Sequence, residues 1–199
     1  MPVSDVPQAG SPMALGTERL LLRDFLEGDW RAVLTYQEDP RYLRFYEWSR
    51  RTPKDVRAFV GQFIAQQHET PRAKFQLAIT HRATRRLIGT CGIRLERAGA
   101  READIGYELA PDFWGHGYAT EAARAVAGWG FSHLLLHRVT AWCIADNAGS
   151  VRVLEKLGMR REGRLRDKHY FKGRWWDVLL YAILAEEWRA RHGTSPTPE

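Results

Sequence analysis

The chain has 199 residues, of which 44% are hydrophobic and 27% charged, and it carries a formal net charge of +6 with an isoelectric point near 9.6. These values are typical of one soluble globular domain, and no apolar run is long enough to cross a bilayer. The arginines are scattered in short clusters, a pattern more typical of a solvated surface than of a nucleic-acid-binding stripe. We therefore expect neither membrane insertion nor a nucleic-acid partner.

Both ends of the chain are rich in Pro, Gly and Ser, which predicts disordered tails at residues 1–14 and 191–199 around a domain at residues 15–190. The first residues show no basic segment followed by an apolar one, so we expect no secretory signal and a cytoplasmic location. Cys91 and Cys143 lack the CxxC spacing of zinc or redox sites. The sequence thus predicts buried free thiols and no metal.

The N-terminal half of the domain reads as one strand followed by two helices. A β-like run at residues 17–23 precedes a helical pattern at residues 27–38. A second helix is predicted at residues 53–68, because Thr52 can cap it and its first position is a proline.

The remainder of the domain switches to strands. Three strand-like runs are separated by Gly or charged residues, as in an antiparallel meander, and a glycine loop follows them. The element order predicts a single α/β (α+β) domain with a mixed, mostly antiparallel, twisted sheet of about seven strands and about four helices. In chain order these later elements are strands 74–80, 87–95 and 103–109, helix 118–131, strand 138–144, helix 150–157 and strands 159–171 and 175–184.

The run IGYELAPDFWGHGYATEA, residues 105–122, joins a strand to an alanine-rich helix through a glycine loop. The first N–H groups of a helix have no intrahelical acceptor and carry partial positive charge, so this loop can bind a pyrophosphate. The dinucleotide fingerprint fits badly, because Thr120 replaces its third glycine, and no Gly-Lys-Ser/Thr follows as in a P-loop. Glycines that serve only a tight turn are the alternative.

The loop resembles the cofactor loop of the GCN5-related N-acetyltransferase (GNAT) superfamily, Gln/Arg-x-x-Gly-x-Gly/Ala, with Gly117 and Ala119 at the last two fixed positions. Trp114 stands where the superfamily has Gln or Arg. In this respect the motif is similar to the branch that includes the ribosomal-protein N-terminal acetyltransferases. Further segments similar to that branch are Asn147-Ala148-Gly149-Ser150, Lys156-Leu157-Gly158-Met159, Gly173-Arg174-Trp175-Trp176-Asp177 and Glu187-Trp188.

The resemblance covers about residues 17–188 and implies an acetyl-CoA-dependent N-acetyltransferase whose sheet is splayed between its fourth and fifth strands. It implies that the loop backbone binds the coenzyme A pyrophosphate and that the fourth strand pairs with the pantetheine arm. Asn147 can equally cap the N–H of Ser150. The implied cofactor-binding residues are Tyr107, Leu109, Trp114, Gly115, His116, Gly117, Tyr118, Ala119, Asn147 and Ser150.

Acetylation of an amine requires loss of a proton from an ammonium and benefits from a hydrogen-bond donor near the leaving thiolate. Asp104 and Glu108 share one face of the fourth strand, where superfamily members often place a general base. Both are candidate bases, and a solvated or ion-paired acid is the alternative for each. The superfamily's tyrosine donor is replaced here by Leu154, so Ser150 is the hypothetical donor or cofactor contact.

The expected acceptor is a primary amine, and the resemblance favours a protein N-terminus. Small amines such as aminoglycosides or polyamines are the second candidate, which acidic walls around the site would favour. A non-catalytic acyl-CoA-sensing or nucleic-acid-binding module is the alternative from another class. The expected partners are acetyl-CoA and the amine acceptor, with a homodimer as an allowed assembly.

Overall fold

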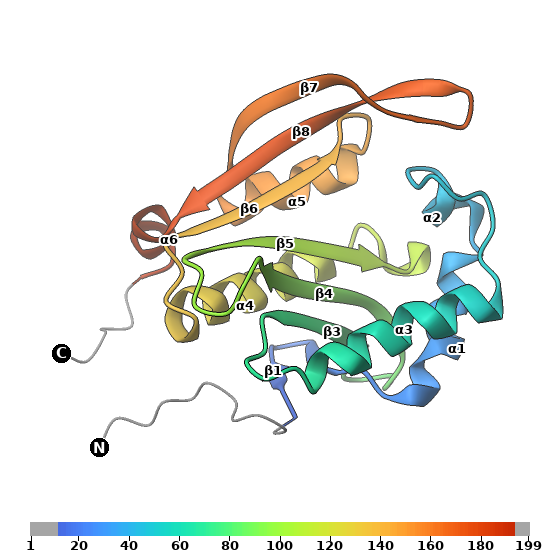
Figure 1. Cartoon of the computed structure of the whole chain (residues 1–199), viewed down its shortest axis with the longest axis horizontal. Helices are drawn as coiled ribbons and strands as arrows, with labels where there is room; N and C mark the ends of the chain where they lie inside the picture. The colour runs from blue at the N-terminus through green and yellow to red at the C-terminus, as the bar shows by residue number, and fades with distance from the viewer. Residues whose placement is uncertain (1–11, 194–199) are drawn as a thin grey trace.

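The computed structural model of the chain describes residues 12–193 (Figure 1). Residues 1–11 and 194–199, which make up most of the two predicted tails, lie outside the described residues. Among the other tail residues, Met13 is buried, Ala14 begins the first strand and the last helix ends at His192. Regular structure therefore starts before residue 15 and continues past residue 190.

One sheet of eight strands forms the centre of the fold. The strands are β1 Ala14–Gly16, β2 Leu20–Asp24, β3 Lys74–His81, β4 Leu87–Leu95, β5 Glu102–Leu109, β6 Arg138–Ile144, β7 Arg160–Phe171 and β8 Arg174–Leu184. Their spatial order is β1-β2-β3-β4-β5-β6-β8-β7, and only β5 and β6 are parallel neighbours. The predicted α/β domain with a mostly antiparallel sheet is confirmed. The additional strand is β1, which has three residues and is too short to show a periodic pattern.

Helices cover both faces of this sheet. They are α1 Trp30–Gln37, α2 Pro40–Leu43, α3 Pro53–Gln67, α4 Tyr118–His133, α5 Ala148–Leu157 and α6 Ala185–His192, with short 3-10 helices at Glu27–Asp29 and Pro111–Phe113. Figure 1 shows α1 and α3 in front of the sheet and α4 and α5 behind it. The four predicted helices are present. The two additional ones, α2 and α6, are short or mostly polar and therefore lack a clear apolar stripe.

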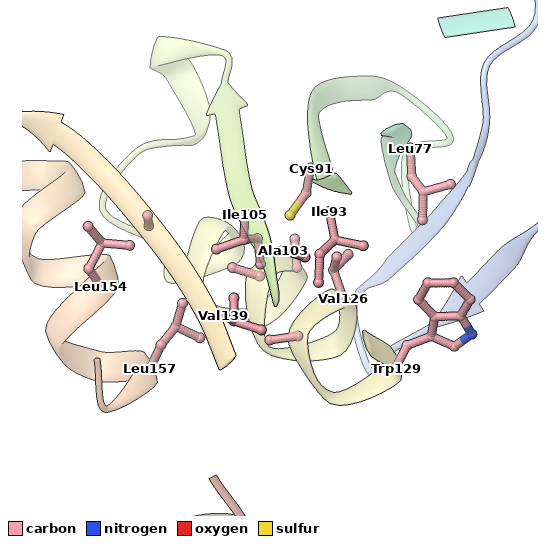
Figure 2. Packing of buried hydrophobic residues seen from close by; sticks show 14 of the residues in the cluster. Leu77, Cys91, Ile93, Ala103, Ile105, Val126, Trp129, Val139, Leu154 and Leu157 are labelled. Atoms are coloured by element: carbon pink, nitrogen blue, oxygen red, sulfur yellow. The ribbon is translucent and has the colours of Figure 1, made fainter. Parts of the chain in front are cut away.

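Two hydrophobic cores fill the space between the helices and the sheet. The larger one lies against α4 and α5, and Figure 2 shows Ile105 of β5, Val126 of α4 and Leu154 of α5 within it. The second lies against α1 and α3 and includes Val33 and Val56. Because side chains alternate along a strand, β5 sends its odd-numbered residues towards the larger core and its even-numbered residues towards α1 and α3.

An opening in the sheet lies between β5 and β6. The two strands pair only at Glu102–Arg138, Ala103–Val139 and Asp104–Thr140, and the described chain provides no strand partner for this edge of β5 at residues 105–109. The additional strand β1 means that the predicted fourth and fifth strands are β5 and β6. The splay predicted between them is thus present.

At the far end of the opening, the two halves of the molecule meet again. Lys172 lies at the tip of the β7–β8 hairpin, and its Nζ donates to the carbonyl oxygen of Leu43 in α2 over 2.5 Å. Beside it, the rings of Phe45 and Trp176 pack edge to face, with centroids 6.0 Å apart. The opening is therefore bounded at one end by the paired strands and at the other by these contacts.

Candidate functional site

The glycine loop at residues 114–119 leads from the second 3-10 helix into α4. Gly115 and Gly117 have φ angles of 82° and 81°, in the left-handed region that side chains disfavour. The helix starts as predicted at Tyr118, and its first intrahelical bond joins Glu121 N–H to Gly117 O. The N–H groups before Glu121 have no intrahelical acceptor, which leaves them available to an anion.

Trp114 fastens this loop to the end of β5. Its indole N–H donates to the carbonyl oxygen of Leu109 over 2.7 Å, while 45% of the residue stays exposed. Two residues that were predicted to contact the cofactor therefore contact each other. The structure gives the Trp114 indole a direct part in positioning the loop.

Arg19 holds the loop from the other side. Its Nη1 donates to His116 O over 3.0 Å, its Nε donates to Glu121 Oε2 over 2.7 Å, and its guanidinium lies over the ring of Tyr118. Burial alone would raise the pKa of Glu121, but the hydrogen bonds from Thr17 and Arg19 outweigh it and lower the pKa. Sequence reasoning missed Arg19, because no local pattern connects it with a loop about a hundred residues away.

A hollow of about 330 Å³ opens beside the loop. Arg19, Arg124 and Lys156 bring three cations to it, opposed by two carboxylates. An anionic group at the start of α4 would lie next to these cations. The lining residues are Glu18, Arg19, Gly117, Thr120, Glu121, Arg124 and Lys156.

Glu108 lies on the α1 side of β5, where its carboxylate accepts several hydrogen bonds. Tyr36 Oη and Gln37 Nε2 donate to Oε1 over 2.6 and 3.0 Å, and Tyr42 Oη and, at 3.4 Å, Tyr46 Oη donate to Oε2. Burial raises the pKa of Glu108, and these hydrogen bonds oppose that rise. The carboxyl group therefore holds a proton more tightly than an ordinary glutamate.

Aromatic residues extend from Glu108 into the second hydrophobic core. Tyr42 stacks on Tyr46 with ring centroids 4.5 Å apart, and Tyr46 stacks on Trp48 at 4.8 Å. Burial raises the pKa of Tyr42 and Tyr46, which keeps their hydroxyl groups neutral and able to donate. The Trp48 indole N–H is buried and has no acceptor among the described residues. No local sequence pattern predicts these contacts, because they join β5 to α2 and the residues after it.

Asp104, the other candidate base, has different surroundings. Arg94 Nε donates to its Oδ2 over 3.0 Å, and Arg94 Nη1 also donates to Gln76 Oε1 over 3.1 Å. Asp104 pairs with Thr140 at the closed end of the opening, whereas Glu108 lies four residues further along β5. Asp104 and Glu108 thus share a face of β5 but lie in different surroundings along it. Of the two acids, Glu108 lies along the part of β5 that β6 does not pair with, and Asp104 lies in the paired part.

Ser150 lies on the opposite face, at the start of α5. Its N–H donates to Asn147 Oδ1 over 3.1 Å, so Asn147 acts as the helix cap that was considered for it. The hydroxyl groups of Ser150 and Tyr107 are 2.9 Å apart, and Tyr107 Oη also donates to Ser150 O over 3.1 Å. Leu154 is fully buried in the larger core. A tyrosine hydroxyl is therefore present beside Ser150, but β5 supplies it.

Three further expectations concern the cysteines, a metal site and a membrane span. Cys91 and Cys143 are buried free thiols, and burial raises their pKa to about 12 and about 11. Within residues 12–193, no group of three His, Cys, Asp or Glu side chains is arranged to hold a metal ion. Among the same residues, no helix combines the length and apolar character needed to cross a membrane.

Comparisons with known proteins place this geometry in a family context. The model of the acetyltransferase (GNAT) domain matches residues 19–160. An uncharacterized N-acetyltransferase, YnaD of Bacillus subtilis (strain 168), is 36% identical over 176 residues, which cover 88% of this chain and 99% of the relative. The [ribosomal protein uS5]-alanine N-acetyltransferase of Escherichia coli (strain K12) is 26% identical over 191 residues, covering 93% and 95%. A crystal structure of a GNAT-family acetyltransferase from Bacillus anthracis superposes with a TM-score of 0.76 at 33% identity, covering 87% and 99%.

Proposed function

Because this chain belongs to the GNAT family of acetyltransferases, whose members use acetyl-CoA, we propose that it acetylates the N-terminal amine of a protein. The observation that carries the proposal is the bounded opening between β5 and β6, with Glu108 on one face and the Tyr107–Ser150 pair on the other. A donor thioester and an acceptor amine can meet within such an opening from opposite faces of the sheet.

Binding of acetyl-CoA is assigned to the loop and to the free edge of β5. The exposed N–H groups at the start of α4 suit the pyrophosphate, and Arg124 and Lys156 supply positive charge beside it. The unpaired backbone at residues 105–109 suits the amide groups of the pantetheine arm, which would continue the sheet as a short strand does. Trp114 and Arg19 then serve by keeping the loop in place.

The proposed acetyl transfer uses groups on the two faces of β5. Glu108 takes a proton from the acceptor nitrogen, which forms the new C–N bond at the acetyl carbonyl carbon. The C–S bond breaks as the tetrahedral intermediate collapses, and its electron pair stays on sulfur. A hydroxyl of the Tyr107–Ser150 pair donates a hydrogen bond to that thiolate, which stabilises the charge as it develops.

The charges near the acceptor side favour a protein N-terminus over a polyamine or aminoglycoside. Arg51 lies over the Trp48 ring, and Arg174 lies over the Trp176 ring and pairs with Asp146. Glu108 is already surrounded by tyrosine hydroxyls. A polycation would need several free carboxylates here, whereas Asp146 is already paired with Arg174 and Glu108 already accepts hydrogen bonds from tyrosines. The relative from Escherichia coli, whose name gives a ribosomal protein as its acceptor, adds support.

An acceptor screen tests the proposal. Acetyl-CoA is mixed with peptides bearing a free N-terminus, with the same peptides blocked at the N-terminus but containing lysine, with spermidine and with an aminoglycoside, and thiol release is followed. We expect release with the free N-termini alone, and mass spectrometry should place one acetyl group on the α-amine. Faster release with spermidine or the aminoglycoside would contradict the protein acceptor while leaving acetyl transfer intact.

A further inference from the structure

Positive charge is concentrated on the β7–β8 hairpin. Residues 160–184 contain seven Lys or Arg against three Asp or Glu, a formal charge of +4 out of +6 for the whole chain. In the fold these residues lie together on one long edge hairpin that projects past the end of β6 (Figure 1).

Several of these cations are free to meet a ligand. Arg160, Arg164 and Arg174 pair with Glu187, Asp177 and Asp146. In contrast, Arg161, Arg166 and Lys168 are exposed and form no ion pair within residues 12–193.

A bulge in β7 presents two of the free cations. The register between β7 and β8 shifts between Leu165 and His169, and Asp167 adopts a φ of 51°. Asp177 stabilises this bulge, because its Oδ1 accepts the Asp167 N–H over 2.9 Å and its Oδ2 accepts Arg164 Nε over 2.6 Å. The bulge borders a surface hollow of about 770 Å³ lined by Arg164, Leu165, Arg166, Asp167, Lys168 and Asp177.

Two exposed aromatic rings lie beside the cations. Tyr170 and Trp175 are cross-strand partners with ring centroids 5.1 Å apart, and they are 61% and 57% exposed. Asp177 lies two residues from Trp175 on β8, so strand alternation puts it on the same face as Tyr170 and Trp175. Arg166 and Lys168 line the hollow together with Asp177, which places these two cations next to that face. The two rings form one contiguous exposed aromatic patch, and such patches, unlike single exposed apolar residues, are informative about binding.

We propose that this face of the β7–β8 hairpin binds single-stranded nucleic acid. Arg166 and Lys168 meet backbone phosphates, and Tyr170 and Trp175 stack on unpaired bases. An acidic polypeptide would pair with the cations but would leave both rings without a matching flat partner. A duplex would keep its bases stacked on each other and away from the rings. Single strands are thus the polyanions that use both parts of the surface.

Fluorescence anisotropy with a dye-labelled, unstructured single-stranded RNA, measured at several salt concentrations, tests the proposal in the full chain. Arg166→Gln together with Lys168→Gln should weaken binding and lower the slope of log K against log salt by about 1.4, since each phosphate contact on a single strand contributes about 0.7. Trp175→Ala should weaken binding about tenfold through lost stacking, and Trp175→Phe should restore most of it.

The matched control is Arg97→Gln together with Arg101→Gln, which removes the same charge from the exposed β4–β5 connection. It should leave RNA binding and its salt slope nearly unchanged. Single-stranded DNA of the same length should bind in the same range, because it offers the same phosphates and bases. Equal loss of binding in the control pair, or equally tight binding of polyglutamate or duplex RNA, would overturn the proposal. Thiol release from acetyl-CoA, measured in parallel, reports the transferase separately.

Discussion

Tyr107 and Glu108 are consecutive residues of β5, yet their hydroxyl and carboxylate groups lie on opposite faces of the sheet. Strand alternation alone produces this division. In the proposed mechanism it separates the base, Glu108, from the donor near the leaving sulfur, and the opening between β5 and β6 joins the two sides.

Replacing Glu108 with Gln should lower kcat by about 10²- to 10⁴-fold, the usual contribution of a positioned base. The pH profile gives the sharper test. Burial raises the pKa of Glu108 above its ordinary value of 4.5, so wild-type kcat/KM should rise with pH through a midpoint above that value. The variant should lose this limb and keep any limb from the acceptor amine. An unchanged profile would rule out Glu108 as the base.

Glu108 should also affect stability in a pH-dependent way. Its pKa is raised in the folded protein, so between the unfolded and folded pKa values the native state binds more protons than the unfolded state. The contribution of this group is therefore present at pH values below 4.5 and is lost as pH rises through the folded pKa. Chemical denaturation across this range should show that loss in wild type and not in Glu108→Gln. A stability difference that grows in the opposite direction would contradict the raised pKa.

The Tyr107–Ser150 pair should act as a unit. Tyr107→Phe and Ser150→Ala should each lower kcat by about tenfold or more, because each removes a hydroxyl from the donor side. The double variant should lose little beyond the larger single effect, since the two groups share one hydrogen bond. Steady-state kinetics with saturating acceptor measures all three. For Ser150→Ala, wild-type kcat and KM for acetyl-CoA would remove Ser150 from the mechanism.

Gly117 should matter for acetyl-CoA binding through its backbone conformation. Gly117→Ala places a side chain at a φ of 81°, which costs about 1–2 kcal/mol, or about a five- to thirtyfold rise in KM for acetyl-CoA if the loop is displaced. Gly99→Ala is the matched control, because Gly99 has a φ of 77° and an added Cβ would meet no atom within 4 Å. The control should lose similar stability without a change in KM. Equal KM values in the two variants would separate the loop from cofactor binding.

Much of the fold was predictable because local patterns determine it. Periodicity located the main strands and helices, and alternation put Asp104 and Glu108 on one face. An ion-paired acid was the alternative considered for Asp104, and its contact with Arg94 fits that alternative. Alternation does not reveal partners from other elements, so neither Arg94 nor the Tyr36 that donates to Glu108 could be identified beforehand. Tyr36 lies 72 residues from Glu108 in the chain, and only tertiary packing brings them together.

For the cofactor loop and the Tyr107–Ser150 pair, too, the sequence predicts the local motif but not the contacts with other elements. The glycines and the start of α4 at Tyr118 were readable from a contiguous motif. The support from Arg19 depends on how β2 lies beside α4, and the meeting of Tyr107 with Ser150 depends on how α5 packs against β5. The replacement of the expected tyrosine by Leu154 is visible in the sequence, but the hydroxyl that a neighbouring strand provides nearby depends on tertiary packing.

The contact between Lys172 and Leu43 closes the second end of the opening, so the opening is a ring and not a groove with one open end. Strand pairing closes one end of the opening, and this hydrogen bond joins the two sides at the other end. If the acceptor of the proposed reaction enters through this ring, a flexible chain terminus would fit the entry better than an amine attached directly to a rigid ring system.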